Sequence, residues 1–169
     1  IGCNPWVATI FAIFAGVCAG GVTGYLHVKW GILGLLAGIL TMTALYSVNL
    51  RIMQRPNIAI IDSPTIYNIG SVIVITFIIV VILILLLTRF FATEFGLAIR
   101  AVGINPKVST AYGINIRIMK IIALSLSNGI VAFAGSLFTQ SQGYADISMG
   151  STTVIVGLAS VIIGEAILH

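Results

Sequence analysis

Charged residues are scarce in this chain: Asp, Glu, Lys and Arg make up 7% of its 169 residues. A soluble domain carries about 25% charged residues, so the composition argues against a water-soluble globule. Hydrophobic residues make up 59% of the chain, and its mean hydropathy is +1.18. We therefore expect a multi-pass protein of a cell membrane, in contact with lipid along its spans.

Cysteine is almost absent, because the only two, Cys3 and Cys18, both lie in the first apolar segment. On one continuous helix their Cα atoms would lie well beyond the roughly 7 Å that a disulfide requires. Neither has another Cys or a His at the spacing of metal ligands, so no metal site and no cofactor are predicted. A basic segment followed by a short apolar run and a cleavage site is also missing, so no signal peptide is predicted.

Patterns typical of catalysis and of nucleic-acid binding are missing too. His27 and His169 are isolated, and the sequence has no HExxH, GxSxG or paired aspartates, which argues against an intramembrane enzyme. The formal net charge is +4, but the basic residues are dispersed and form no basic face. We therefore expect no nucleic-acid partner and interpret these charges as topology signals.

Five apolar runs are candidate membrane spans, near the length of about 20 residues that a helix needs to cross a bilayer. They are about Trp6–Leu26, Trp30–Asn49, Tyr67–Thr88, Ile121–Gln142 and Thr152–Leu168. The last run is short and contains Glu165, so it either spans the membrane or is re-entrant. The predicted fold class is an all-α polytopic helical bundle.

The chain is expected to form one transmembrane domain over residues 1–169. It begins at Ile1 without an initiating Met and ends at His169, directly after an apolar run. We therefore expect it to be an internal part of a longer polypeptide. Missing termini would leave the full number of spans open.

Basic residues resist translocation, so their distribution predicts which connections face the cytoplasm. The first and third connections hold six of them: Lys29, Arg89, Arg100, Lys107, Arg117 and Lys120. The second holds Arg51 and Arg55, partly offset by Asp62, and the fourth holds only Asp146. Residues 89–120 are therefore predicted to be cytoplasmic. Residues 51–66, predicted as a short interfacial helix or a folded-back loop, and residues 143–150 are predicted to lie outside.

Glycines recur at every fourth position of the first predicted span, at Gly16, Gly20 and Gly24. This spacing places them on one helix face, where another backbone can approach closely. Gly34 and Gly38 repeat the pattern in the second span. We expect tight helix packing at both faces, and a sliding surface in a moving transporter is the alternative.

Polar side chains within membrane spans are candidates for function because they are costly there unless paired or solvated. Asn49 in the second span and Asn128, Ser136 and Gln140 in the fourth are the candidates for a substrate path. Asn128 is expected either to hydrogen-bond across helices or to line that path. None of the four is ionisable, which disfavours a proton- or sodium-coupled transporter.

The segment between the third and fourth spans is predicted to form two short helices. In the first, from Glu94 to Val102, the side chains of Phe95, Ile99 and Val102 share one face. Gly103 is expected to end it in the left-handed conformation. Asn105 and Pro106 are typical of a helix start, so the second helix runs from Pro106 to about Tyr112 and stops at Gly113. Asn115 is expected to cap the following span.

Four segments of the sequence resemble those of one known family. They are TEFGLAIRAVGINPKVSTAYGIN at residues 93–115, IALSLSNGIVAFAGSLFTQSQGYADISMG, GLASVIIGEAI and, upstream, GILTMTALYSVNLRIMQRPNI. They resemble the permease subunit of bacterial ABC importers of the branched-chain amino acid and ribose permease superfamily, closest to a branch with amino-acid substrates. The resemblance covers nearly the whole chain.

This resemblance implies a non-enzymatic subunit in the bacterial cell membrane. Its partners would be an ATP-binding subunit, a second permease copy and an extracytoplasmic solute-binding protein. The loop at residues 89–120 would couple to the ATPase, as the family's corresponding loop does. The positions that match the family's loop pattern are Glu94, Gly96, Arg100, Ala101, Gly103, Asn105, Ala111 and Gly113.

A passive channel and a purely structural membrane subunit are the alternatives, because neither requires catalytic residues. The absence of an ATP-binding partner would distinguish both from a permease. The identity of the solute, and whether the second copy is identical, are left open by the sequence.

Overall fold

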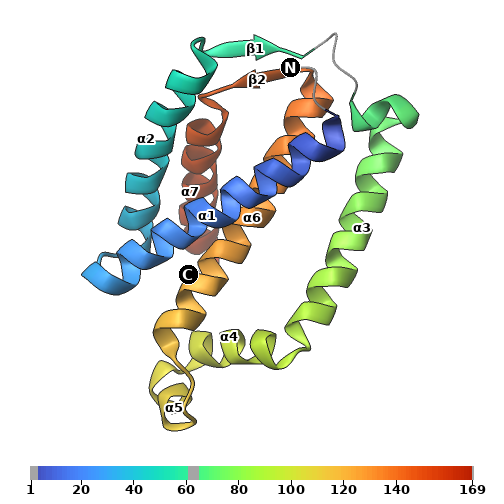
Figure 1. Ribbon diagram of the computed structural model, residues 1–169. Coiled ribbons are helices and arrows are strands. Elements are labelled where there is room, and N and C mark those ends of the chain that lie inside the picture. Colours follow the sequence, from blue (N-terminus) through green and yellow to red (C-terminus); the bar gives the residue numbers. More distant parts are fainter. Residues whose placement is uncertain (1–3, 61–64, 169) are drawn as a thin grey trace.

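The computed structural model describes residues 4–60 and 65–168 (Figure 1). The elements run in the order α1 (Pro5–Trp30), α2 (Gly34–Met53), β1 (Asn57–Ala59), the 3-10 helix η1 (Ile66–Ile69), α3 (Val72–Phe91), α4 (Glu94–Ile104), α5 (Pro106–Ala111), α6 (Ile116–Gln142), β2 (Tyr144–Asp146) and α7 (Met149–Leu168). Cys3, Asp62 and His169 lie outside the described residues.

The predicted multi-span helical fold is confirmed. Within the described residues, the five helices α1, α2, α3, α6 and α7 are long and apolar enough to cross a membrane. The last of them is a continuous helix of 20 residues, longer than the run predicted from its apolar residues. At 1.5 Å per residue it reaches about 30 Å, the thickness of a bilayer core.

The centre of the fold is the antiparallel pair of α1 and α6, which cross in close contact (Figure 1). A Cβ added to Gly20 would lie 2.5 Å from the Leu124 carbonyl oxygen, and one added to Gly24 would lie 2.9 Å from Ile121 Cα. A Cβ at Gly16 would meet the Cβ of Ala132. The three glycines therefore let the two backbones approach as no larger residue would.

The second glycine pair does not pack in this way. A Cβ added to Gly38 would meet nothing within 4 Å, and one added to Gly34 would only approach His27 Nδ1 at 3.9 Å. The prediction of tight packing at Gly34 and Gly38 is therefore not met among the described residues. A hydrogen bond joins α2 to α1 instead, because Thr23 donates to Thr41 Oγ1 at 2.8 Å.

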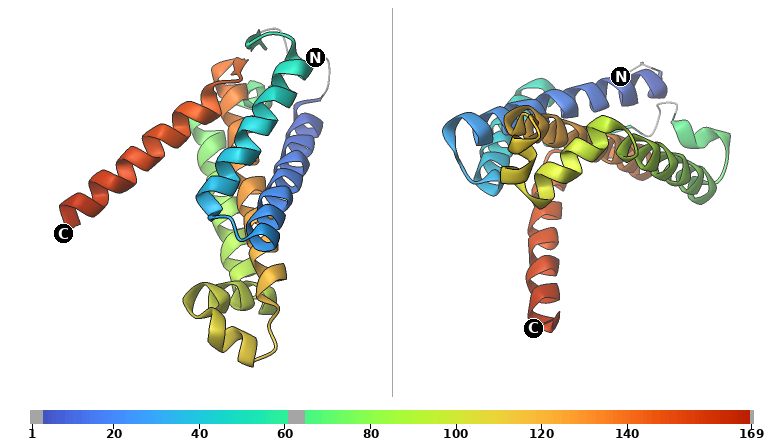
Figure 2. Two further views of the ribbon diagram at one scale, coloured as in Figure 1. Left: turned by 90° about the vertical axis from the view of Figure 1, so that its left-hand side faces the viewer. Right: turned by 90° about the horizontal axis from the view of Figure 1, so that it is seen from below.

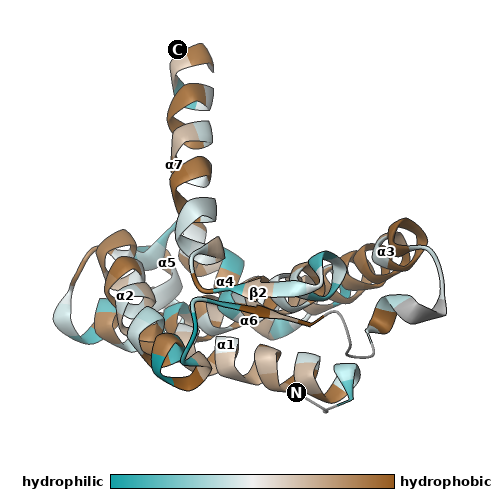
Figure 3. Ribbon diagram, turned by 90° about the horizontal axis from the view of Figure 1, so that it is seen from above, coloured by the Kyte–Doolittle hydropathy of each residue, from teal (hydrophilic) through white to brown (hydrophobic). Residues whose placement is uncertain are grey.

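Helices α3 and α7 lie apart from the central pair (Figure 2). Neither span has a buried residue within its hydrophobic window. Figure 3 shows α3 as hydrophobic along most of its length, and its window has a hydropathy of 3.1. Contacts with lipid or with other protein helices would suit such a surface, since every side of α3 is apolar.

A short antiparallel ribbon joins the two connections that were predicted to lie on the outer side. Asn57 pairs with Asp146, Ile58 with Ala145 and Ala59 with Tyr144. No strand was predicted here. Strands of three residues are too short to show an alternating pattern, and their partners lie far apart in the sequence.

Beyond the ribbon, the Asp146 carboxylate organises the turn into α7. It accepts hydrogen bonds from the hydroxyl and the backbone N–H of Ser148, at 2.6 and 2.7 Å. Both bonds favour the charged carboxylate and hold the pKa of Asp146 below its ordinary value.

Replacing Gly20 with Ala should destabilise the protein. The new methyl group would collide with the backbone of α6 at Leu124 and Ser125, which cannot move without separating the helices. Overpacking of this kind costs about 1–3 kcal/mol. We expect G20A to lower the thermal unfolding temperature of the full-length protein in detergent by several degrees.

The matched control is G38A, on a helix where the added methyl group meets nothing within 4 Å. Alanine is a better helix former than glycine by about 1 kcal/mol, so this variant should be neutral or slightly stabilised. Equal losses in both variants would contradict the packing role of Gly20.

Candidate functional site

Helices α4 and α5 form a compact element at the end of the molecule opposite the β ribbon (Figure 1). Thr93 caps the start of α4, because its Oγ1 accepts a hydrogen bond from Gly96 N at 3.4 Å. The same hydroxyl donates to the Phe90 carbonyl oxygen at 2.6 Å, which ties the cap to the end of α3. Thr93 was not predicted as a cap, although a Thr directly before an acidic first turn is an N-cap signal.

Gly96 lies against α3 rather than facing outward. A Cβ at this position would collide with the Phe90 carbonyl oxygen and lie 2.5 Å from Phe91 Cα. The residue is buried, and it allows α4 to turn sharply away from α3. Packing against α3 therefore accounts for a glycine at this position.

The predicted end of the first short helix was wrong. Gly103 does not adopt a positive φ; it is helical, and α4 continues to Ile104. The helix ends instead at Asn105, whose backbone is extended with φ −147° and ψ 99°. The residue before a proline is biased away from the helical conformation, so Pro106 decides this boundary.

The other predicted caps are formed. Asn105 Oδ1 accepts hydrogen bonds from Lys107 N at 3.1 Å and Val108 N at 3.2 Å, so it caps α5. Gly113 follows α5 with a φ of +79°. Asn115 Oδ1 accepts from Arg117 N at 3.2 Å and from Ile118 N at 3.4 Å, which caps α6. The two short helices are thus joined to each other and to α6 through capped turns.

The outward surface of this element is partly apolar. Ile104 is 85% exposed and Tyr112 is 80% exposed, while Val102 and Ser109 are buried. Phe95 lies on the same side of α4 as Val102 but is 62% exposed, so this side of the helix is not buried along its whole length. Ile104 and Tyr112 were not predicted as functional residues, because no local pattern distinguishes them from core residues.

Most of the candidate coupling residues are accessible on the same element. Ala101 is half-buried, and the exposed ones are Glu94, Arg100, Gly103, Asn105, Ala111 and Gly113. Arg100 lines a cleft of about 770 Å³ between the end of α3 and α4. Within the described chain its guanidinium has no hydrogen-bond or ion-pair partner, so its donors are available to another molecule.

Two of the four candidate path residues meet at one cavity. Asn49 of α2 and Asn128 of α6 both line a cavity of about 240 Å³ between α1, α2, α6 and the start of α7. Asn128 Nδ2 donates to the Leu124 carbonyl oxygen of its own helix at 3.1 Å, so the expected bond across helices is not formed among the described residues.

The other two candidates, Ser136 and Gln140, lie outside this cavity and join helices together. Thr9 of α1 hydrogen-bonds to Ser136 at 3.1 Å and accepts from Gln140 Nε2 at 3.0 Å. Gln140 Oε1 also accepts from Ile66 N at 3.2 Å, which fixes η1 to α6. These contacts give both residues a packing role near one end of the bundle.

Comparisons with known proteins give a consistent result. The family described as the branched-chain amino acid transport system permease component matches residues 1–168. The tyrosine transport system permease protein of Clostridioides difficile (strain R20291) is 44% identical over 165 residues, which are 96% of this chain and 56% of that protein. A protein of Rickettsia prowazekii (strain Madrid E) is 40% identical over 163 residues, covering 95% of this chain and 58% of that protein.

A more distant relative is the autoinducer 2 import system permease protein of Salmonella choleraesuis (strain SC-B67). It is 26% identical over 169 residues, covering 94% of this chain and 47% of that protein. The chain thus spans about half the length of the curated relatives it matches. No solved structure gives a significant match.

Replacing Asn105 with Ala should loosen α5. The change removes the acceptor of two backbone N–H groups, and loss of such a cap costs about 1 kcal/mol. We expect hydrogen exchange across residues 105–113 of the full-length protein to become about fivefold faster, measured by mass spectrometry in detergent.

The control is N105D, in which a carboxylate oxygen can accept the same two hydrogen bonds. Its exchange should stay close to that of the unmodified protein. If N105A leaves exchange in this segment unchanged, the cap does not stabilise α5.

Proposed function

This chain belongs to the family of branched-chain amino acid transport system permease components, and on that premise we propose that it is the membrane subunit of an ATP-driven importer. It is a multi-pass membrane protein that forms part of the path for a small solute. A separate ATP-binding subunit docks on the α4–α5 element, which faces the cytoplasm. The observation that carries this proposal is the exposure of Ile104 and Tyr112 on one protruding element, together with an Arg100 that has no partner among the described residues.

An apolar surface with one cation suits a docking site for a protein partner. Exposed side chains such as Ile104 and Tyr112 would be removed from water on docking, which supplies affinity. Arg100 would then bind a carboxylate or carbonyl group on the partner through its fork of donors. The small residues Gly103, Ala111 and Gly113 are exposed beside them and would allow close approach.

The element is built to transmit a displacement. It is tied to α3 through Thr93 and Gly96 and to α6 through the Asn115 cap. Because α3 has no buried residue in the chain, it can tilt without breaking a packed core. ATP-driven closure of the partner would move α4 and α5 and so tilt the attached spans, which changes the side from which the path is open.

The remaining partners follow from the same assignment. A second permease copy would complete the membrane unit, and an extracytoplasmic binding protein would deliver the solute. We propose an amino acid as the solute, since the relative from Clostridioides difficile is named for tyrosine transport. L-Tyrosine is therefore the first compound to test.

Replacing Arg100 with Ala should uncouple ATP hydrolysis from uptake. A hydrogen bond to a charged group contributes about 1.5–3 kcal/mol, so its loss should weaken the mechanical link about tenfold or more. We expect uptake of L-tyrosine per ATP hydrolysed to fall by that factor in vesicles containing the full-length permease, its ATP-binding subunit and its binding protein.

The control is R55A, which removes another exposed arginine at the opposite end of the molecule. This variant should keep normal coupling. Unchanged coupling in R100A would contradict the proposed contact. A permease that co-purifies with no ATP-binding subunit would contradict the importer itself and favour a passive channel or a structural subunit.

A further inference from the structure

The cavity beside Asn49 and Asn128 lies on the α2 side of the α1–α6 pair. We propose that it is a binding station for the imported solute, that this solute carries no net charge, and that Asn49 and Asn128 bind its polar groups. This inference rests on the proposed importer function. It adds the location of a solute-binding site within the membrane subunit and the residues that bind the solute.

Asparagine supplies the unused hydrogen-bonding groups of this cavity. Asn128 donates through Nδ2 to its own helix, and its Oδ1 accepts no hydrogen bond from the described residues. The side chain of Asn49 and the hydroxyl of Tyr46 have no partner in the described part of the chain either. Asn49 and Tyr46 are exposed and Asn128 is half-buried, so the unused groups of all three are accessible to a solute that enters the cavity.

The two threonines that line the same cavity already form hydrogen bonds within the chain. Thr23 donates to Thr41, and Thr41 donates to the Ala37 carbonyl oxygen at 2.8 Å. They hold α1 against α2 and form part of the wall. We therefore assign solute binding to the side-chain amides of Asn49 and Asn128 and to the Tyr46 hydroxyl, which keep hydrogen-bonding groups without a partner among the described residues.

The charge of the solute follows from what the wall contains. None of the described residues that line the cavity is Asp, Glu, Lys, Arg or His. A net charge in such a site would lack a counter-ion and would be costly to desolvate. Amide and hydroxyl groups can hydrogen-bond a neutral polar molecule, or the two ends of a zwitterion whose opposite charges offset each other, at a lower cost than a net charge.

Size and apolar contacts agree with a single small solute. The cavity holds about 240 Å³, just below the range of about 300–1,000 Å³ that is usual for drug-sized ligands. Met42, Leu45 and Ile147 form its apolar part. Methionine adapts its shape readily, which suits a site that must bind and then release.

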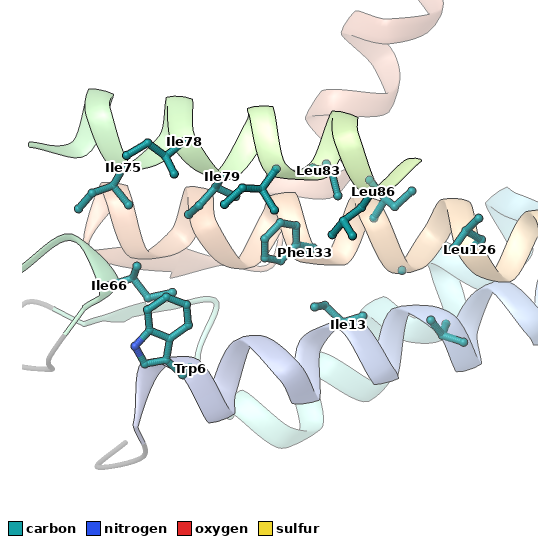
Figure 4. Close-up of a pocket in the computed structure, with 14 residues that line it drawn as sticks. Trp6, Ile13, Ile66, Ile75, Ile78, Ile79, Leu83, Leu86, Leu126 and Phe133 are labelled. Atoms are coloured by element: carbon teal, nitrogen blue, oxygen red, sulfur yellow. The ribbon is translucent and has the colours of Figure 1, made fainter. Parts of the chain in front are cut away.

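A larger hollow on the other side of the central pair has different chemistry. It measures about 580 Å³, and aliphatic and aromatic side chains from α1, α3 and α6 point into it, including Trp6, Ile79 and Phe133 (Figure 4). A polar solute would lose its hydrogen bonds with water there and gain none. The polar cavity is thus the better of the two for the solute.

The first test measures transport by vesicles that contain the complete importer, with L-tyrosine as the probe. N49A and N128A should each raise the KM of uptake about tenfold. N128D should lower uptake further, because it puts a negative charge in the cavity. The control is S127A, at an exposed serine beside Asn128 that does not line the cavity, and its KM should be unchanged.

The second test needs no transport activity. In a full-length background in which every native cysteine is replaced by serine, Asn49→Cys is labelled with a small water-soluble thiol reagent. L-Tyrosine should slow the labelling at least threefold, whereas L-glutamate and L-lysine should not. Val48→Cys is the control; it is exposed, does not line the cavity, and should show no protection by any of the three.

The outcomes separate the two proposals. Absence of ATP-driven uptake by the unmodified complex would overturn the importer, and protection of Asn49→Cys by L-tyrosine would then support amino-acid binding in the cavity without import. Normal uptake by N49A and N128A with unchanged KM, together with unprotected Asn49→Cys, would overturn the cavity and leave the importer standing. Protection by L-glutamate or L-lysine would overturn the assignment of a solute without net charge.

Discussion

The close approach of α1 and α6 is the constraint on which the rest of the structure depends. In lipid, apolar surfaces gain little by leaving their solvent, so helices associate through tight packing and hydrogen bonds. Gly20 and Gly24 place the backbone of α1 against that of α6, and the Thr9, Ser136 and Gln140 cluster closes one end of the pair. α2 then joins this pair through the Thr23–Thr41 hydrogen bond.

This central pair separates two environments. On the α2 side, polar groups of Asn49 and Asn128 face a small cavity. On the α3 side, the lining is made of aliphatic and aromatic side chains. The tilt proposed for the attached spans would reach both sides, because α3 lines the apolar hollow and α6, which carries Asn128, lines the polar cavity.

Some helix boundaries of the α4–α5 element could be predicted from the sequence, and one could not. The caps at Asn105 and Asn115 depend on a side chain and the N–H groups two and three residues later, so they can be identified from sequence. Gly103 failed as a stop because Pro106 imposed an extended conformation on the residue before it, and the helix continued to that point. The steric restriction that Pro106 places on Asn105 therefore decided where the helix ends, and the glycine did not.

The sequence by itself determined the membrane class, the five spans and the family, because hydropathy, span length and motif are properties of short contiguous segments. Only the tertiary structure decided which polar residues line a cavity and which ones hydrogen-bond between helices. Asn49 and Asn128 meet at a cavity, whereas Ser136 and Gln140 bind Thr9 and Ile66 across helices. It also paired β1 with β2 and turned Gly96 toward α3 instead of outward. These outcomes depend on which distant segments lie side by side, and that is set by helix packing.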